Sequence, residues 1–519
     1  MISIIPAPSV THVLTFIAAF PLLILAYKFL RGHRHKLPLP PGPKGLPILG
    51  NLLQLPKSVE WQRYHEMSQE LGTDILYLNV TGTSIVILDT LDAATEVFEK
   101  NWAEFSDRPH LPMAGDLMGW GTSFPYKNYG ESWRLDRRIF HHEMNAVPAK
   151  RFRPSQATAC KRLLNRLMDK KVVEVVGEVM HTAGDIVMSA TYGINKASDQ
   201  EYYIQLADDA VKTVVEALVP GAYLVDAFPI LKHVPSWFPG ASFKKKAKIG
   251  SDKRELMFDE PFALVKRQIE TGDLAPSFVS YCLQSLEGHV YGNANEEHIK
   301  SAAGVMYGAA VETTSSVLAN AIWAFVNHPE AVKRAQQEID HVLGRGDLPT
   351  FDDEDILPYT SSLIKETKRW QTPFPLGLPH STPAGGVCKG FWIPKGSIVM
   401  GNCWAILHDE SIYPDPHRFN PHRFLTPDGK SIDKSIPDPS IAMYGYGRRI
   451  CPGRFVADAS VWIILSSIIA AFDFHRADDT GGLDHPFAKS HFHTTFYSSQ
   501  DQKKSRNAFE SNRSSGPLV

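Results

Sequence analysis

The sequence predicts a mainly α-helical protein with small β-sheets, built as one large catalytic domain behind an N-terminal transmembrane helix. Helical periodicity of apolar residues runs through six segments, near residues 130–145, 176–193, 296–327, 330–343, 357–370 and 453–472. Two short β-rich runs, Ile75–Val80 and Ile85–Leu88, are separated by Thr-Gly-Thr-Ser and predict a hairpin. The first 27 residues contain no Lys, Arg, Asp or Glu.

Composition argues against several classes of protein. Apolar residues make up 43% of the 519 and charged residues 21%, which is ordinary for a globular protein. The formal net charge of -2 gives no electrostatic case for nucleic-acid binding. The 5 cysteines are scattered without a Cys-x-x-Cys pair, which argues against a disulfide framework and a structural zinc site. No Gly-x-Gly-x-x-Gly turn follows a strand, so a redox reaction would need electrons from another protein.

The apolar stretch from Val10 to Leu30 has the length of one membrane-spanning helix. A basic cluster stands at its C-terminal end: Lys28, Arg31, Arg34 and Lys36. Positive charge on that flank predicts an N-terminus in the lumen and a main domain in the cytosol. A cleaved signal peptide is the alternative, but it would carry basic residues before the apolar run, and this chain has none there.

The chain divides into four predicted parts. Residues 1–30 form the transmembrane anchor, and residues 31–50 form a Pro-rich linker. The linker is either a rigid spacer that orients the body above the membrane or a plain connection. Residues 51–490 form the catalytic domain. Residues 491–519 form a polar tail whose composition predicts disorder.

The strongest chemical signal is the loop from Tyr444 to Arg454, in which three glycines flank Cys451 and an apolar helix follows at once. Glycine allows positive φ and lets the backbone approach a flat ligand closely. A loop that leads into a helix offers free N–H groups to a negative sulfur. An inert buried thiol is the usual fate of a free cysteine. The number of specified positions argues against it here.

This loop resembles the cysteine-loop signature of the cytochrome P450 family, Phe-x-x-Gly-x-Arg-x-Cys-x-Gly, with Tyr444 in place of Phe. The resemblance implies the cytochrome P450 fold and a haem b cofactor with Cys451 as the axial ligand of the iron. Thiolate ligation favours O–O cleavage. Arg449 is the arginine of the signature and is expected to pair with a haem propionate.

Glu366 and Arg369 stand three residues apart on a predicted helix, which places both side chains on one face. Alone this spacing is weak evidence, because any exposed helix can show it. Its position upstream of the cysteine loop, with Arg423 between, matches the family. The resemblance implies a buried triad of Glu366, Arg369 and Arg423 that braces the loop. His422 departs from the family's usual acid, which puts a side interaction in doubt.

The segment Gly308–Thr314 interrupts a long apolar helix with small residues, an acid and two hydroxyls. A Thr hydroxyl can bond the carbonyl four residues earlier, and an acid beside it suggests a proton path. The alternative is a packing helix with Glu312 on its solvent side. The resemblance assigns Glu312 and Thr313 to proton delivery during oxygen activation. Ala310 replaces a family Gly, so the local kink is expected to be milder.

Three further residues are candidates for binding the haem propionates. Trp133 and Arg137 are four residues apart and match the family's Trp-x-x-x-Arg motif. In isolation they would be a half-buried Trp and a surface Arg. The resemblance implies that both contact one propionate. His380, after Pro379, stands where relatives often have another propionate partner.

The resemblance extends over residues 38 to 480 and is strongest to fungal, microsomal-type monooxygenases of secondary metabolism. It implies insertion of one atom of O2 into an apolar small molecule, such as a terpenoid, polyketide or indole. Electrons would come from a separate NADPH–cytochrome P450 reductase, with cytochrome b5 as a second candidate donor. The resemblance also implies that the protein lies in the endoplasmic reticulum membrane and spans it once, with the catalytic domain in the cytosol. The alternatives are a haem-thiolate isomerase, dehydratase or peroxidase, and a decayed haem-binding relative.

Two other segments bear on substrate and membrane. The loop 110–126 is rich in apolar residues, which suits a substrate pocket or, equally, a packed loop. Residues 228–231 and 237–239 are apolar turns that precede a lysine cluster at 244–248. This pattern predicts a second membrane contact or, as readily, an ordinary surface loop.

Overall fold

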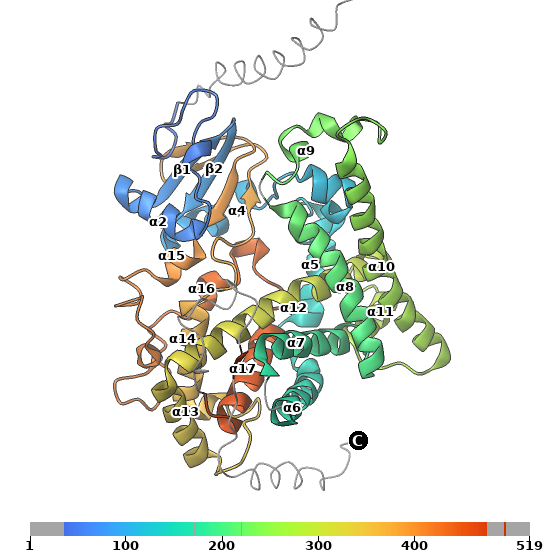
Figure 1. Cartoon of the computed structure of the whole chain (residues 1–519), viewed down its shortest axis with the longest axis vertical. Helices are drawn as coiled ribbons and strands as arrows, with labels where there is room; N and C mark the ends of the chain where they lie inside the picture. The colour runs from blue at the N-terminus through green and yellow to red at the C-terminus, as the bar shows by residue number, and fades with distance from the viewer. Residues whose placement is uncertain (1–35, 170–172, 220, 475–492, 495–519) are drawn as a thin grey trace, which may run out of the picture. The chain divides into compact units, whose positions relative to one another are not determined.

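A computed structural model describes residues 36–169, 173–219, 221–474 and 493–494 (Figure 1). The predicted membrane anchor and, apart from residues 493–494, the polar tail lie outside the described residues. The chain divides into two compact units, a division that the sequence did not predict. The first unit comprises the chain up to residue 109 together with residues 375–406 and 445–449, and the second comprises the rest.

The first unit is built on a four-stranded sheet of order β1-β2-β7-β4. β1 (Ile75–Val80) and β2 (Thr83–Leu88) form the predicted antiparallel hairpin. β7 (Ile398–Gly401) runs parallel to β2, and β4 (His380–Ser381) runs antiparallel to β7. A second hairpin joins β5 (Gly386–Cys388) to β6 (Phe391–Ile393).

Short helices complete this unit: η1 (Leu52–Gln54), α2 (Glu60–Leu71), α3 (Leu91–Thr95), η2 (Glu96–Lys100), α4 (Trp102–Phe105), α15 (Cys403–Leu407, at the unit boundary) and η9 (Gly447–Arg449). Tyr64 and Met67 of α2 pack on Leu76, Leu78 and Ile87 of the hairpin. Alternation along β1 and β2 places these side chains on one face of the sheet, which α2 covers.

The second unit is helical. Its long helices are α5 (Glu131–Met144), α6 (Arg153–Asp169), α7 (Val175–Tyr192), α8 (Ala197–Leu218), α10 (Ser242–Thr271), α11 (Phe278–Glu287), α12 (Glu296–Asn327), α13 (Pro329–Val342), α14 (Pro358–Trp370) and α17 (Arg454–Ala471). Shorter helices are η3 (Pro112–Leu117), η4 (Trp120–Thr122), η5 (Pro148–Phe152), α9 (Leu224–Ala227), η6 (Pro229–His233), η7 (Glu354–Ile356), η8 (Pro421–Phe424) and α16 (Ser440–Met443). β3 (Val173–Glu174) pairs with β8 (His493–Thr494). All six predicted helices are present.

α12 is the central helix of the second unit and lies alongside α7 and α17 (Figure 1). It begins at a capping box between Asn295 and His298 and ends before Pro329, which cannot continue the helix and opens α13. Its first half packs in a core cluster that contains Ala303, and its second half packs in another that contains Leu318.

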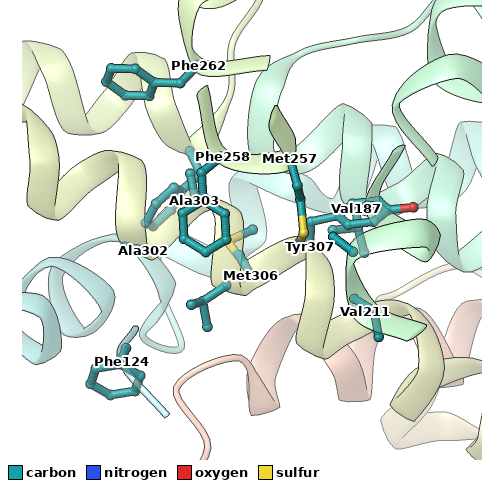
Figure 2. Packing of buried hydrophobic residues seen from close by; sticks show 14 of the residues in the cluster. Phe124, Val187, Val211, Met257, Phe258, Phe262, Ala302, Ala303, Met306 and Tyr307 are labelled. Carbon is teal, nitrogen blue, oxygen red and sulfur yellow. The ribbon is translucent and has the colours of Figure 1, made fainter. Parts of the chain in front are cut away.

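The contact between α10 and α12 depends on glycine. Figure 2 shows Phe258 and Met257 of α10 over the residues of α12 near Ala303 and Tyr307. A Cβ at Gly304 would lie 2.7 Å from the Phe258 ring, and one at Gly308 would lie 3.0 Å from Met257. The absence of a side chain at Gly304 and Gly308 therefore allows α10 to pack closely on α12.

Both α12 and α17 are long and apolar enough to cross a bilayer, but 56% of the most apolar window of each is buried inside the protein. Both belong to the core of the second unit, where neighbouring helices cover their apolar side chains.

Candidate active site

Cys451 differs from the other four cysteines because the residue is partly exposed, whereas the others are buried. It lies just before α17, and its N–H donates to the Tyr444 carbonyl at 2.8 Å. Burial raises the pKa of the Cys451 thiol, while the Gly453 N–H and the charges of Arg137 and Arg454 act in the opposite direction. The site thus supplies the N–H group that the sequence predicted beside the sulfur.

Two guanidinium groups of the second unit bind the backbone around this cysteine. Arg137 on α5 donates from Nη1 to the Ile450 carbonyl at 2.6 Å, and Arg454 donates from Nη1 to the Cys451 carbonyl at 3.1 Å. Burial, together with the charge of Arg454, lowers the pKa of Arg137 to about 10. At neutral pH Arg137 therefore remains a cation beside the cysteine loop.

Two of the three glycines of the loop take up the positive φ that was expected. Gly445 has φ +75° and Gly447 has φ +51°, whereas Gly453 has φ -84°. A Cβ at Gly447 would lie 2.2 Å from the Phe98 carbonyl oxygen, which no side chain tolerates. Glycine is required at Gly447 for both reasons.

Arg449 and His380 lie in the first unit, and both bind the same short stretch of main chain. Arg449 donates from Nε to the Ser106 carbonyl at 2.8 Å, and Nδ1 of His380 lies 2.8 Å from the Phe105 carbonyl. Both side chains are buried. Arg108 is a second buried guanidinium here and donates to the carbonyls of residues 378 and 379. Nothing in the sequence distinguished Arg108 from other arginines.

The surroundings of His380 restrict what it can bind. Burial, and then the charge of Arg108, lower the pKa of His380 well below its usual range, so the ring is neutral. The tautomer that donates from Nδ1 to Phe105 leaves Nε2 as an acceptor. Donation from Nε2 to a carboxylate would need the imidazolium, which Arg108 and Arg449 oppose. A propionate contact at His380 therefore remains a prediction that needs a shift in protonation.

Trp133 is buried and packs between two aromatic rings. Its ring centroid lies 5.4 Å from that of Phe124, nearly parallel, and 5.0 Å from that of Tyr129. Arg137 follows one turn later on α5 and reaches the cysteine loop. The role of both in propionate binding stays a prediction.

The middle of α12 is more exposed than the turns directly before and after it. Ala309 and Glu312 are exposed and Thr313 is half-buried, whereas the flanking turns are mostly buried. The Thr313 hydroxyl donates to the Ala309 carbonyl at 2.8 Å, which is the bond to the residue four earlier that was expected. These three residues share one face of the helix.

The Glu312 carboxyl lies in dense protein surroundings although part of it reaches solvent. These surroundings raise its pKa, and the negative charge of Asp208 on α8 adds to the shift. A carboxyl with a raised pKa keeps its proton closer to neutral pH, which suits a group that delivers protons.

The structure brings Glu366, Arg369 and Arg423 together. Arg369 donates to both carboxylate oxygens of Glu366, at 2.7 and 2.9 Å, and the Arg423 Nε lies 3.1 and 3.2 Å from them. Glu366 and Arg369 are fully buried. The remaining donors of Arg369 bind the carbonyls of Leu407 and Pro416, each at 2.8 Å.

His422 stands where the family has an acid. Arg334 of α13 donates from Nη1 to Nε2 of His422 at 2.9 Å. Burial and the charge of Arg334 lower the pKa of His422, so the imidazole stays neutral and accepts. A hydrogen bond from the Arg334 guanidinium to the neutral imidazole replaces the interaction that was in doubt. The triad beside it is complete.

The apolar side chains of the loop 110–126 lie mainly in the core. Met113, Met118, Trp120 and Phe124 are buried in the cluster that packs on α12. The packed-loop interpretation holds for these four residues. A separate cleft of about 370 Å³ is lined by polar side chains that include Arg254, Glu297 and Lys300.

The donor set fits a haem held by a thiolate. The Cys451 thiol lies beside an N–H donor and two cations, which together stabilise a negative sulfur. The sequence identified Cys451 and Arg137. It gave no signal for Arg454 beyond its place at the end of the loop.

The family profile described as Cytochrome P450 matches residues 40–493. Cytochrome P450 monooxygenase 98 of Postia placenta is 41% identical over 89% of this chain and 88% of its own length. Cytochrome P450 monooxygenase ple1 of Rhodocybe pseudopiperita is 39% identical over 92% of this chain and 91% of its own. Tryptamine 4-monooxygenase of Psilocybe cyanescens is 37% identical over 86% of this chain and 88% of its own.

The triad yields a prediction about stability. Glu366→Gln removes the carboxylate that compensates two guanidinium groups, one of them fully buried. Loss of one partner of a buried ion pair costs about 3–5 kcal/mol, so the midpoint of urea unfolding should fall sharply. Asp352→Asn is the matched control, because Asp352 is 92% exposed in its pair with Arg153 and should cost at most about 1 kcal/mol. Equal stability of the two variants would contradict a structural role for the triad.

Proposed function

This chain belongs to the cytochrome P450 family of monooxygenases, and on that premise we propose that it inserts one atom of O2 into an apolar small molecule. The observation that carries the proposal is the Cys451 thiol, in a partly exposed residue, with an N–H donor and two cations around it. Haem b, bound through this sulfur, supplies the binding and activation of O2.

Residues of the chain would hold the haem by its iron and its carboxylates. Cys451 is the axial ligand in this proposal. Arg137 and Trp133 on α5, and Arg449 and His380 in the first unit, are the proposed partners of the propionates. Arg108 joins them as a buried cation beside His380. Guanidinium groups suit this task because they bind carboxylates with two parallel hydrogen bonds.

Proton delivery is assigned to Glu312 and Thr313. The hydroxyl of Thr313 donates its hydrogen to the Ala309 carbonyl. The lone pairs of its oxygen therefore stay available to accept a hydrogen bond from a proton donor. Glu312, whose pKa is raised, is the adjacent carboxyl that would supply the proton. Both groups lie on the exposed face in the middle of α12.

The proposed electron donor is a separate NADPH–cytochrome P450 reductase, with cytochrome b5 as a second candidate. The exposed face of α5 and the turn after it is rich in basic side chains: Arg134, Arg138, His141, His142, Lys150 and Arg151. A basic face of this kind steers an acidic redox partner to the surface. α5 also carries Arg137, which binds the cysteine loop directly.

The proposed substrate is an apolar fungal secondary metabolite such as a terpenoid, polyketide or indole. The named relatives come from fungi, and the name of the Psilocybe cyanescens relative specifies tryptamine, an indole. Because Met113, Met118, Trp120 and Phe124 pack in the core, they are poor candidates for contacts that select the substrate.

The proposed location is the endoplasmic reticulum membrane, spanned once by residues 1–30. The region between α8 and α10 supports a second membrane contact. Its exposed apolar side chains are Leu224, Phe228, Ile230, Trp237 and Phe238, and lysines 244–246 and 248 follow on α10. Trp237 is 81% exposed and Ile230 74%, which is unusual for side chains of this size.

Haem ligation is tested by spectroscopy. The reduced protein with carbon monoxide should show the red-shifted Soret band of thiolate-ligated iron. Cys451→Ser should abolish this band, while Cys388→Ser, which alters a buried thiol outside the loop, should retain it. An unchanged spectrum in Cys451→Ser would refute the assignment. Product formation that requires both O2 and added reductase would separate a monooxygenase from the isomerase, peroxidase and non-catalytic alternatives.

Proton delivery is tested by coupling. Thr313→Ala should keep haem and substrate binding but divert electrons from NADPH into peroxide. Product formed per NADPH should fall by on the order of a hundredfold, the lower end of what a positioned proton donor contributes. Thr314→Ala is the matched control, because Thr314 is a buried neighbour on another face of α12. Normal coupling in Thr313→Ala would count against the role.

The second membrane contact is tested on a protein that lacks residues 1–30. It should still bind vesicles that contain anionic lipid, because an apolar turn beside a basic cluster enters the interface. Replacing Ile230 and Trp237 with Asp should abolish binding. Val147→Asp is the control, since Val147 is 77% exposed but lies outside the patch. A truncated protein without affinity for the vesicles would disprove the contact.

A further inference from the structure

Asp458 on α17 accepts two hydrogen bonds at a single carboxylate oxygen. The Tyr444 hydroxyl donates to Oδ1 at 2.7 Å, and the Lys368 ammonium donates to the same atom at 2.7 Å. Asp458 stands seven residues after Cys451, in the second turn of the helix that follows the cysteine loop. A charged acceptor makes these hydrogen bonds stronger than neutral ones.

Tyr444 also holds the other end of the loop. Its carbonyl accepts the Cys451 N–H at 2.8 Å, so one residue binds the backbone of the cysteine and a side chain of α17. The family signature has phenylalanine at this position, and phenylalanine has no hydroxyl to donate. The link from Tyr444 to Asp458 is therefore a departure of this chain from the signature.

Lys368 connects the same carboxylate to α14. It lies between Glu366 and Arg369, whose buried ion pair fixes that helix. The side chain of Lys368 is 12% exposed and that of Asp458 is 39% exposed. The ion pair is thus partly shielded from water, which makes it stronger than a surface pair.

We propose that Tyr444 is a positioning residue for the Cys451 sulfur, and that its hydroxyl holds the cysteine loop to Asp458 and, through Asp458, to Lys368. The proposal rests on haem ligation by Cys451. It adds that the hydroxyl and the ammonium together disperse the negative charge of Asp458. An undispersed carboxylate near the sulfur would oppose the negative charge of the thiolate.

The midpoint reduction potential of the haem iron distinguishes this role from simple loosening of the loop. Tyr444→Phe leaves the charge of Asp458 less dispersed, and added negative potential disfavours reduction, so the midpoint potential should fall. Asp458→Asn removes the charge, so the potential should rise. The double variant should match Asp458→Asn, because the hydroxyl acts through the carboxylate. Shifts of the same sign in the two single variants would overturn the proposal.

The anchoring of the cysteine loop by Tyr444 is tested separately, by a rate measurement. Conversion of the ferrous carbon monoxide complex to the form that lacks the red-shifted band should be about tenfold faster in Tyr444→Phe, as expected for one charge-assisted hydrogen bond. Tyr413→Phe is the matched control, since the Tyr413 hydroxyl donates to the Pro437 carbonyl and meets no carboxylate. Equal conversion rates in Tyr444→Phe and Tyr413→Phe would overturn the anchoring role.

If Tyr444→Phe fails to bind haem, a second variant tests the same proposal. Lys368→Gln leaves Asp458 without its cation and should lower the midpoint potential, and an unchanged potential would overturn the proposal. The unsubstituted protein separates the two levels of inference. If it lacks the red-shifted band, haem ligation by Cys451 fails. If the band is present and Tyr444→Phe leaves the potential unchanged, only the role of Tyr444 fails.

Discussion

The second unit depends on one buried carboxylate. Glu366 has no access to water, and an ionised group in that position persists only if it is compensated by opposite charge and hydrogen bonds. Arg369 and Arg423 provide both. Their remaining N–H groups must also be satisfied, and they take the carbonyls of residues 407, 414, 415, 416 and 418. One charge on α14 thereby determines the path of a segment that has little regular structure of its own.

This constraint continues from α14 toward the sulfur. Lys368 stands between the two triad residues of α14, so its position is fixed by their ion pair. From there the hydrogen bonds run to Asp458, to Tyr444 and to the Cys451 N–H. The cysteine loop contains two positive-φ glycines and only the three-residue helix η9, so it needs such contacts to hold one conformation. The triad and the cysteine loop are therefore parts of one continuous polar network.

Whether the sequence could predict a feature depends on how far apart along the chain the interacting residues lie. Six of the long helices and the first hairpin were predicted because periodicity and turn residues are local signals. Glu366, Arg369 and Arg423 were found only through their order along a family pattern, since a contact across 57 residues leaves no local trace. Arg108 and the division into two units were missed for the same reason. Arg454 was missed although its hydrogen bond to the Cys451 carbonyl spans only three residues, because an arginine at the start of a helix is no signal by itself.

α12 shows how one helix meets the demands of stability and chemistry in separate places. Its two halves are buried in different core clusters, and each is apolar enough to hold the helix without help from the middle. An acid and a hydroxyl in either half would cost stability, because buried polar groups need partners. At Glu312 and Thr313 the helix is partly exposed, so the cost is small. The same partial burial raises the pKa of Glu312, which is the property that proton delivery requires.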